Sequence, residues 1–223
     1  MISIAQKIIS YIFPLNIEKR RGDLTNQLEI TIENGRHVLN TKHVNYSFGG
    51  LHKVFEKIFE KEKIETLEIK NVLILGFGAG DVVEMLLEKY KFNCSITGIE
   101  KDHVVIELAM KYFNIKRFQN LKLLNEDAFT YVQSSQESFD MIIIDLFVDD
   151  KVPKKFDQDD FLNNINKLKA SKGIVFFNRP FYDEATQKQS LEVAKKMNQI
   201  IGNTSLNKIK SYGIENCVLV HRH

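Results

Sequence analysis

Short apolar runs alternate with longer segments of helical periodicity along most of this chain. The runs lie at residues 71–75, 94–99, 121–124, 141–144 and 173–177. Continuous apolar runs of this kind are typical of strands buried on both faces of a parallel sheet. Helices are expected at 81–90, 103–113, 128–133, 158–168 and 184–201, and a closing pair of strands at 204–212 and 217–221. The pattern predicts an α/β protein with a doubly wound sheet.

The first part of the chain has a different pattern and predicts a small lobe over residues 1–65, followed by the main domain at 66–223. Residues 2–13 have apolar positions at helical spacing and stop before Pro14, which predicts a short helix that packs on its own domain or on a partner subunit. Alternation over 28–39 around Asn34-Gly35 predicts a β-hairpin. A core-packed helix is expected to begin near Gly50.

The apolar run at 71–75 leads into a turn that contains Gly76, Gly78 and Gly80. Glycines let such a turn adopt positive φ and bring the backbone close to a ligand. A dinucleotide fingerprint needs a further glycine where this chain has Asp81, so the spacing favours an adenosyl-nucleoside cofactor over NAD. The alternative is a glycine turn that only allows a helix and a strand to pack closely.

Acidic residues follow the next three predicted strands, at the sheet edge where open α/β sheets bind ligands. Glu100 is placed to accept hydrogen bonds from a ribose; its alternative role is helix capping, but Asp102 is better placed for that. Asp127 is placed to reach an adenine amine or to cap the following helix, and both options stay open. Asp145 is expected beside the reactive end of the cofactor.

These motifs together resemble the class I S-adenosylmethionine-dependent methyltransferase fold and, within it, the spermidine synthase-like family. The resemblance is carried by the glycine turn and by Glu100-Lys101-Asp102, Asp127-Ala128 and the segment from Phe139 to Asp145. It implies a Rossmann-like sheet of seven strands that ends in an antiparallel hairpin. It also implies that Gly76, Gly78, Gly80, Glu100, Lys101, Asp127 and Ala128 bind S-adenosylmethionine or its decarboxylated form.

Three departures from the family pattern bear on the reaction. Ala79 stands where spermidine synthases have an aspartate, Leu51 precedes His52 in place of a tyrosine, and Leu146-Phe147-Val148 replace small polar residues. Fewer carboxylates weaken recognition of a multiply charged amine. The sequence therefore ranks methyl transfer to a small acceptor first and aminopropyl transfer, as in spermidine synthase, second. A non-catalytic nucleoside-binding or assembly module is the third hypothesis.

Four residues are catalytic candidates for an amine acceptor. Asp145 can orient the amine and accept its proton, and Asp150 can hold a distal cationic group. Tyr46 can hydrogen-bond the nucleophile, and His52 can act as a base. The alternatives are a charged surface loop for the aspartates and packing roles for Tyr46 and His52.

Composition is that of an ordinary globular enzyme, with 223 residues, 43% hydrophobic residues and a formal charge of +2. Lys19-Arg20-Arg21 is too short a basic run to predict nucleic-acid binding, and no apolar run has the length of a membrane span. Cys94 and Cys217 lie in apolar runs, which favours reduced thiols and a cytoplasmic location. We expect a small-molecule substrate and no metal. The resemblance implies a homodimer through the N-terminal lobe.

Overall fold

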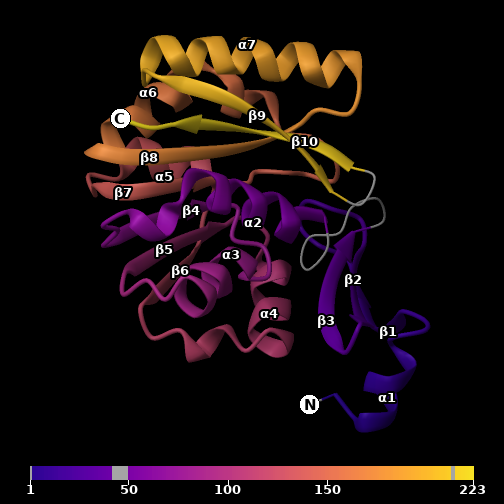
Figure 1. Ribbon diagram of the computed structural model, residues 1–223. Helices are drawn as coiled ribbons and strands as arrows, with labels where there is room; N and C mark the ends of the chain where they lie inside the picture. Colours follow the sequence, from indigo (N-terminus) through magenta and orange to yellow (C-terminus); the bar gives the residue numbers. More distant parts are fainter. Residues whose placement is uncertain (1, 42–49, 212–213) are drawn as a thin grey trace.

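The computed structural model describes residues 2–41, 50–211 and 214–223, which form a central mixed sheet and a small N-terminal antiparallel sheet (Figure 1). The central order is β6-β5-β4-β7-β8-β10-β9, and β10 runs antiparallel to both of its neighbours. The strands are β4 (Asn71–Leu75), β5 (Ser95–Glu100), β6 (Leu121–Asn125), β7 (Phe139–Ile144), β8 (Lys169–Pro180), β9 (Thr204–Ser211) and β10 (Ile214–His221). The predicted seven-stranded α/β fold is confirmed.

Helices cover both faces of this sheet. One face is covered by α2 (Gly50–Glu62), α3 (Asp81–Glu84) and α4 (His103–Tyr112). The other face is covered by α5 (Ala128–Ser134), α6 (Asp159–Leu168) and α7 (Glu184–Ile200). In β4, Val72 and Ile74 pack into the first core and Leu73 and Leu75 into the second. A strand with apolar neighbours on both faces needs an unbroken apolar run, which explains the sequence pattern.

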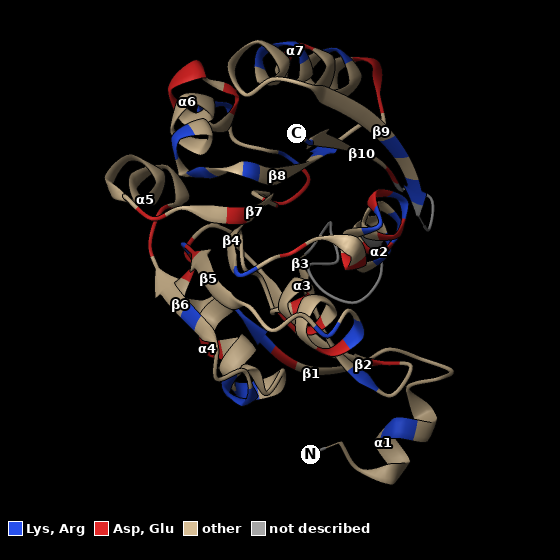
Figure 2. Cartoon of the chain, turned by 60° about the vertical axis from the view of Figure 1, so that its left-hand side comes forward, with Lys and Arg blue, Asp and Glu red and all other residues tan. Residues whose placement is uncertain are grey.

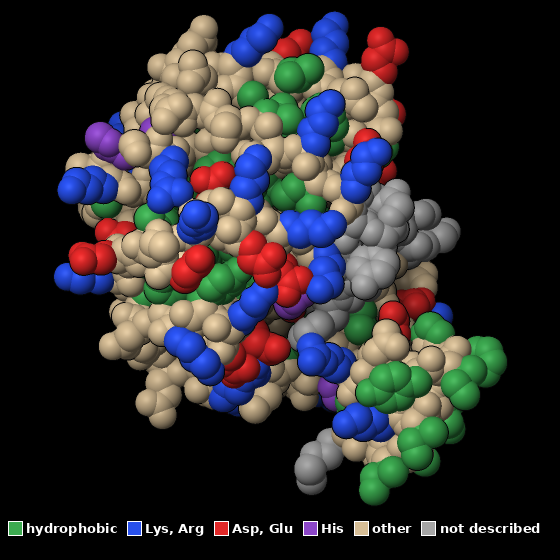
Figure 3. Space-filling model, viewed as in Figure 1, with side chains coloured by type: hydrophobic (Ala, Val, Ile, Leu, Met, Phe, Trp, Pro, Cys, Tyr) green, Lys and Arg blue, Asp and Glu red, His purple; other side chains and the backbone are tan. Residues whose placement is uncertain are grey.

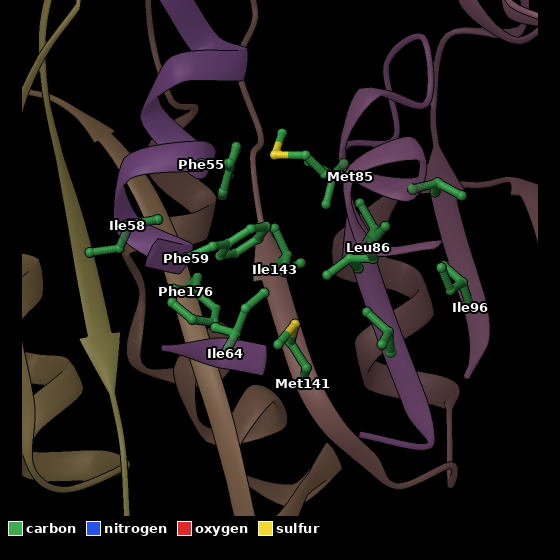
Figure 4. Packing of buried hydrophobic residues seen from close by; sticks show 14 of the residues in the cluster. Phe55, Ile58, Phe59, Ile64, Met85, Leu86, Ile96, Met141, Ile143 and Phe176 are labelled. Atoms are coloured by element: carbon green, nitrogen blue, oxygen red, sulfur yellow. The ribbon is translucent and has the colours of Figure 1, made fainter. Parts of the chain in front are cut away.

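The first core is built largely from aromatic and branched side chains. Figure 4 shows Phe55 and Phe59 of α2 directed toward Ile143 and Phe176 of the sheet, with Met85 nearby. The Phe59 and Phe176 rings lie 5.2 Å apart at an edge-to-face angle. These contacts hold α2 on the sheet.

Two predicted elements of the main domain differ in detail from the structure. The helix expected over 81–90 is α-helical only to Glu84 and continues as a π-helix over Met85–Lys89. Strand β8 begins at Lys169 rather than at Gly173. Lys169 pairs with Phe139 of β7, and the register then shifts so that Ile174 pairs with Met141, which leaves extra residues in β8. These first residues are largely polar and have no hydrophobic pattern, so periodicity misses them.

The N-terminal lobe is a three-stranded sheet of β1 (Leu15–Arg20), β2 (Leu28–Glu33) and β3 (Arg36–Thr41). The predicted hairpin is β2–β3; its turn residues Asn34 and Gly35 have φ of 50° and 76°. These positive values match the type I′ turn that favours Asn-Gly. Strand β1 was not predicted. The lobe packs on α4 through an apolar cluster of Leu28, Ile30 and Leu39 with Val104, Val105 and Leu108.

Helix α1 (Ile4–Ile9) is shorter than predicted and lies at the outer edge of the lobe (Figure 1). Ser3 caps it, and Ser10 just after it holds the hairpin turn by accepting a hydrogen bond from the Gly35 amide at 2.9 Å. Its apolar side chains are largely exposed, with Ile4 at 81% and Ile12 beyond the helix at 71%. Figure 3 shows this apolar surface at the N-terminal end. Packing of this helix on its own domain is therefore slight; packing on a partner subunit stays a prediction.

Charged residues are mixed on the outer helices, as on α6 and α7 in Figure 2. Among the described helices, none combines the length and the hydrophobicity that crossing a bilayer requires.

Candidate active site

A cavity of about 260 Å³ lies at the carboxyl ends of β4, β5 and β7. The chain reverses its direction of strand addition here, since β5 and β6 lie on one side of β4 and β7 and β8 on the other. Such a switch point leaves a crevice that binds ligands in open α/β sheets. Its lining contains most residues predicted to bind a cofactor, namely Gly76, Gly78, Glu100, Lys101, Asp127 and Ala128, together with the catalytic candidate Asp145.

The glycine turn lies on the floor of this cavity. Gly76 has a φ of 87°, and a Cβ there would lie 2.2 Å from the Asp145 carbonyl oxygen. A side chain at position 76 is therefore excluded both by conformation and by space. Gly78 has a φ of 57°, and its amide points to Glu100. Gly80, with a φ of 89°, precedes α3 and lies outside the main cavity, at a small adjoining hollow.

Glu100 ends β5, and its carboxylate is held by backbone amides. Oε2 accepts from the Gly78 amide and Oε1 from the Asp102 amide, each at 3.0 Å. Burial raises the pKa of Glu100, while these amides act in the opposite direction. Asp102 caps α4 by accepting from the Val104 amide at 3.0 Å. Each carboxylate oxygen of Glu100 keeps a lone pair for a ligand hydroxyl, so its ribose role stays a prediction with a suitable geometry.

Asp127 caps α5, because its carboxylate accepts from the Phe129 amide at 2.9 Å. Two lysines that line the cavity also bind it: Lys155 Nζ lies 2.6 Å and Lys101 Nζ 3.0 Å from Oδ2. Burial acts to raise the pKa of Asp127, but the two lysines and the Phe129 amide lower it to about 2. Asp127 therefore combines the capping role with a place in the cavity wall. Its contact with adenine is not tested by these interactions.

Asp145 follows β7 and has one side-chain donor, Asn178 Nδ2, at 2.9 Å. Asn178 is fully buried in β8, and its own Oδ1 accepts from Asn216 Nδ2 of β10 at 2.9 Å. This second bond fixes which end of the Asn178 amide faces Asp145. Burial raises the pKa of Asp145 to about 7. The negative charges of Asp81 and Glu100 also raise this pKa, whereas the hydrogen bond from Asn178 lowers it. A carboxyl with this pKa exchanges protons near neutral pH.

The other catalytic candidates lie differently. Asp150 is exposed, accepts from the Tyr182 hydroxyl at 3.0 Å and does not line the cavity. His52, on α2, lies behind the cavity wall with its Nδ1 2.8 Å from Asp81 Oδ2. Tyr46 lies outside the described residues. Of the four, only Asp145 is placed in the cavity wall by the described part of the chain.

The rest of the cavity wall is mainly apolar. After Asp145, the chain runs along the cavity through Leu146, Phe147 and Val148, turns at a bridge between Val148 and Lys151, and returns at Pro153. Phe55 of α2 and Leu28 of the N-terminal sheet line it from elsewhere. This part of the wall suits the apolar portion of a ligand whose polar groups meet the carboxylates at the strand ends.

A group with metal-ligating atoms adjoins the site. Ligand atoms of Asp23, Asp102 and His103 lie within 4.8 Å of one another. Ordinary hydrogen bonds account for them, since Asp102 caps α4 and Asp23 binds the His103 ring at 2.6 Å.

A sequence model of the spermine/spermidine synthase domain matches residues 52–217, which is most of the chain. The chain belongs to this family. The predicted resemblance to the spermidine synthase-like family is confirmed.

Among curated relatives, the polyamine aminopropyltransferase of Lachnospira eligens is 29% identical over 123 residues, 52% of this chain and 43% of that protein. The eEF1A lysine and N-terminal methyltransferase homolog of Drosophila melanogaster is 25% identical over 139 residues, 57% of this chain and 20% of that protein. The matched segments thus span less than half of these relatives.

Solved structures have the same fold. A probable spermidine synthase from Corynebacterium glutamicum superposes with a TM-score of 0.76 at 16% identity, over 93% of this chain and 79% of that chain. Human methyltransferase-like protein 13 in complex with SAH superposes with a TM-score of 0.62 at 17% identity, over 78% of this chain and 82% of that chain. At these identities the likeness supports the fold alone, which is shared by aminopropyltransferases and methyltransferases.

Sequence reasoning missed two polar residues of the site. Asp81 lines the cavity, but from the sequence it counted only as the position where a dinucleotide fingerprint has a further glycine. Asn178 ends an apolar run, and a single amide there has no recognisable spacing. The sequence offered one signal for both residues, which is their position. Asp81 directly follows the glycine turn after β4, and Asn178 directly follows the apolar run of β8, so both lie near the carboxyl edge of the sheet.

Proposed function

We propose that this protein is an aminopropyltransferase, which moves the aminopropyl group of decarboxylated S-adenosylmethionine to a small amine. One observation carries the proposal: the cavity wall around the glycine turn bears the acidic side chains of Asp81 and Asp145, and no described lysine or arginine of the lining pairs with either; Asp81 pairs with His52, which does not line the cavity. The described lysines of the lining, Lys101 and Lys155, both bind Asp127.

Charge separates the two donors. S-adenosylmethionine has a carboxylate on its amino-acid arm, whereas the decarboxylated form has only positive groups there. A second carboxylate brought within about 5 Å of the first costs ~3 kcal/mol at an effective dielectric constant of about 20. An ammonium at the same distance is stabilised by a similar amount. The acidic wall therefore favours the decarboxylated donor.

The chemistry needs an unprotonated acceptor amine, because a protonated amine has no lone pair. Asp145, with its pKa of about 7, can take that proton as the amine attacks. A new N–C bond forms to the aminopropyl group, the C–S bond breaks, and methylthioadenosine leaves with the sulfur lone pair. The Asn178 amide holds Asp145 in one orientation, and the apolar wall excludes water from the attack.

Methyl transfer is the second candidate, and the sequence ranked it first. Ala79 favours it, because this residue packs in the apolar cluster under the N-terminal sheet and offers no carboxylate to an amine. Two observations lead us to rank aminopropyl transfer first. Asp81 brings to the cavity wall a carboxylate that the sequence-based comparison of the two reactions did not include, and several relatives are named polyamine aminopropyltransferase.

The test is calorimetric titration of the purified chain with each donor, followed by product analysis with a set of diamines. We expect the decarboxylated donor to bind at least tenfold more tightly and to yield methylthioadenosine. Tighter binding of the intact donor, with transfer of its methyl group, would replace this proposal by methyl transfer. Binding of neither would favour the non-catalytic hypothesis.

A further inference from the structure

Asp81 is an acidic group of the cavity lining, and only one of its two carboxylate oxygens has a hydrogen-bond donor among the described residues. Its side chain is 12% exposed and lines the wall at the start of α3. Oδ2 accepts a hydrogen bond from His52 Nδ1 at 2.8 Å. Oδ1 is shielded from solvent and has no hydrogen-bond partner in the described part of the chain. A buried carboxylate oxygen without a donor is uncommon, because it loses its hydrogen bonds to water on folding and no protein hydrogen bond offsets that free-energy cost.

The fold keeps this carboxylate in place in spite of that cost. Asp81 directly follows Gly80, whose φ of 89° sets the direction of α3, and its bond to His52 ties α3 to α2. Its negative charge is felt at Asp145 across the cavity floor. Two other acidic groups of the lining have more donors than Asp81: Glu100 has two backbone amides, and Asp127 has two lysines and an amide. Asp145 has one donor, the Asn178 amide.

The neighbouring loop residue cannot serve instead. Ala79 is 4% exposed, packs with Leu28, Val104 and Leu108, and does not line the main cavity. Within the segment 76–81, Asp81 is therefore the residue that brings a carboxylate to the cavity wall.

We propose that Asp81 determines which donor this protein uses, by accepting a hydrogen bond at Oδ1 from the terminal ammonium of the donor's aminopropyl arm while His52 holds Oδ2. This inference rests on the proposed function and names the residue that recognises the amine. An ammonium supplies the missing donor and a positive charge together, whereas a carboxylate on the same arm would face Asp81 with like charge.

The experiment compares Asp81→Asn with wild type, using three ligands: decarboxylated S-adenosylmethionine, S-adenosylmethionine and methylthioadenosine, which lacks the aminopropyl arm. Glu84→Gln is the matched control, because it also removes a carboxylate from α3. The Glu84 carboxylate pairs with Arg117 and does not line the cavity. We expect Asp81→Asn to weaken the decarboxylated donor at least tenfold and methylthioadenosine less than twofold. Glu84→Gln should change neither.

Two results would overturn the inference while leaving the proposed function intact: an unchanged preference for the decarboxylated donor in Asp81→Asn, or an equal loss of all ligands in that variant. A wild type that prefers intact S-adenosylmethionine would instead contradict the proposed function itself.

A measurement on the wild type avoids dependence on folding of the variant. A deamino donor, with a propyl group in place of the aminopropyl arm, keeps the sulfonium but lacks the ammonium. We expect it to bind at least tenfold more weakly than decarboxylated S-adenosylmethionine. Equal binding of the two would show that the amine is not recognised and would sink the proposal.

Discussion

Asp127 and Asp145 have the same side chain, follow strands β6 and β7 at the carboxyl edge of one sheet and line one cavity, yet their surroundings differ. Asp127 has two lysines and a helix amide, and its pKa falls to about 2. Asp145 has one neutral amide and two acidic neighbours, and its pKa rises to about 7. The first is a permanent anion that shapes the wall, and the second is a group that can gain and lose a proton. The neighbouring groups, rather than the residue type, therefore determine whether each aspartate stays ionised or exchanges a proton near neutral pH.

The largest expected effect comes from removing the proton acceptor. Asp145→Asn keeps the size of the side chain but cannot take a proton, so we expect kcat for aminopropyl transfer to fall about 10³-fold. Donor affinity should change less than threefold. Steady-state kinetics and calorimetry check this, with Asp160→Asn on the exposed start of α6 as a control. A variant with more than a tenth of wild-type activity would remove Asp145 from the mechanism.

Asn178 sharpens the contrast, because it is the one hydrogen-bond donor to the Asp145 side chain among the described residues. Asn178→Leu removes a bond that favours the ionised carboxylate, so the pKa of Asp145 should rise further. We expect the acidic limb of the pH–kcat profile to move upward by about one pH unit, with about a tenfold loss at pH 7 that is recovered at higher pH. A uniform loss at all pH values would indicate a merely structural role.

The two aspartates should also act on stability in opposite directions. The raised pKa of Asp145 means that the folded state binds its proton more tightly than the unfolded state, so stability is lost as pH rises from about 4 to about 7. Asp145→Asn should therefore be more stable than wild type above pH 7, and this advantage should vanish toward pH 4. Urea denaturation at several pH values measures it.

Asp127 should behave in the opposite way, since its lowered pKa gives stability that is present above about pH 4 and lost as pH falls toward 2. Asp127→Ala removes a helix cap and should destabilise the fold by about 1 kcal/mol at pH 7. The same urea series provides the check. A stabilised Asp127→Ala or a destabilised Asp145→Asn at pH 8 would contradict the comparison.

The smallest effect is expected at Asp150, which is exposed and bonded to Tyr182 outside the cavity. Asp150→Asn should leave kcat unchanged and raise KM for the acceptor amine about twofold, by weakening a long-range attraction. Acceptor titrations at low and high salt measure this. A rise above tenfold would mean that Asp150 contacts the acceptor directly.

Periodicity and turn chemistry were enough to predict the central sheet, the β2–β3 hairpin and the three carboxylates at the strand ends. These features depend on local sequence and on a rule of sheet topology. The partners of the carboxylates were out of reach, because Lys155 reaches Asp127 from 28 positions away and Asn178 reaches Asp145 from 33. Strand β1 was missed for the same reason, since its pairing with β2 rather than its own pattern defines it.

Gly76 couples the position of the glycine turn to the position of Asp145, so the two cannot be adjusted separately by design. Its missing side chain lets the β4 turn rest against the Asp145 backbone, where a Cβ would come within 2.2 Å of the carbonyl oxygen. The turn that we propose to hold the donor and the residue that we propose to deprotonate the acceptor therefore lie against each other in one corner of the fold. New acceptor preferences can be built into the apolar loop around it, at Leu146 to Val148, but the corner itself admits no gradual change.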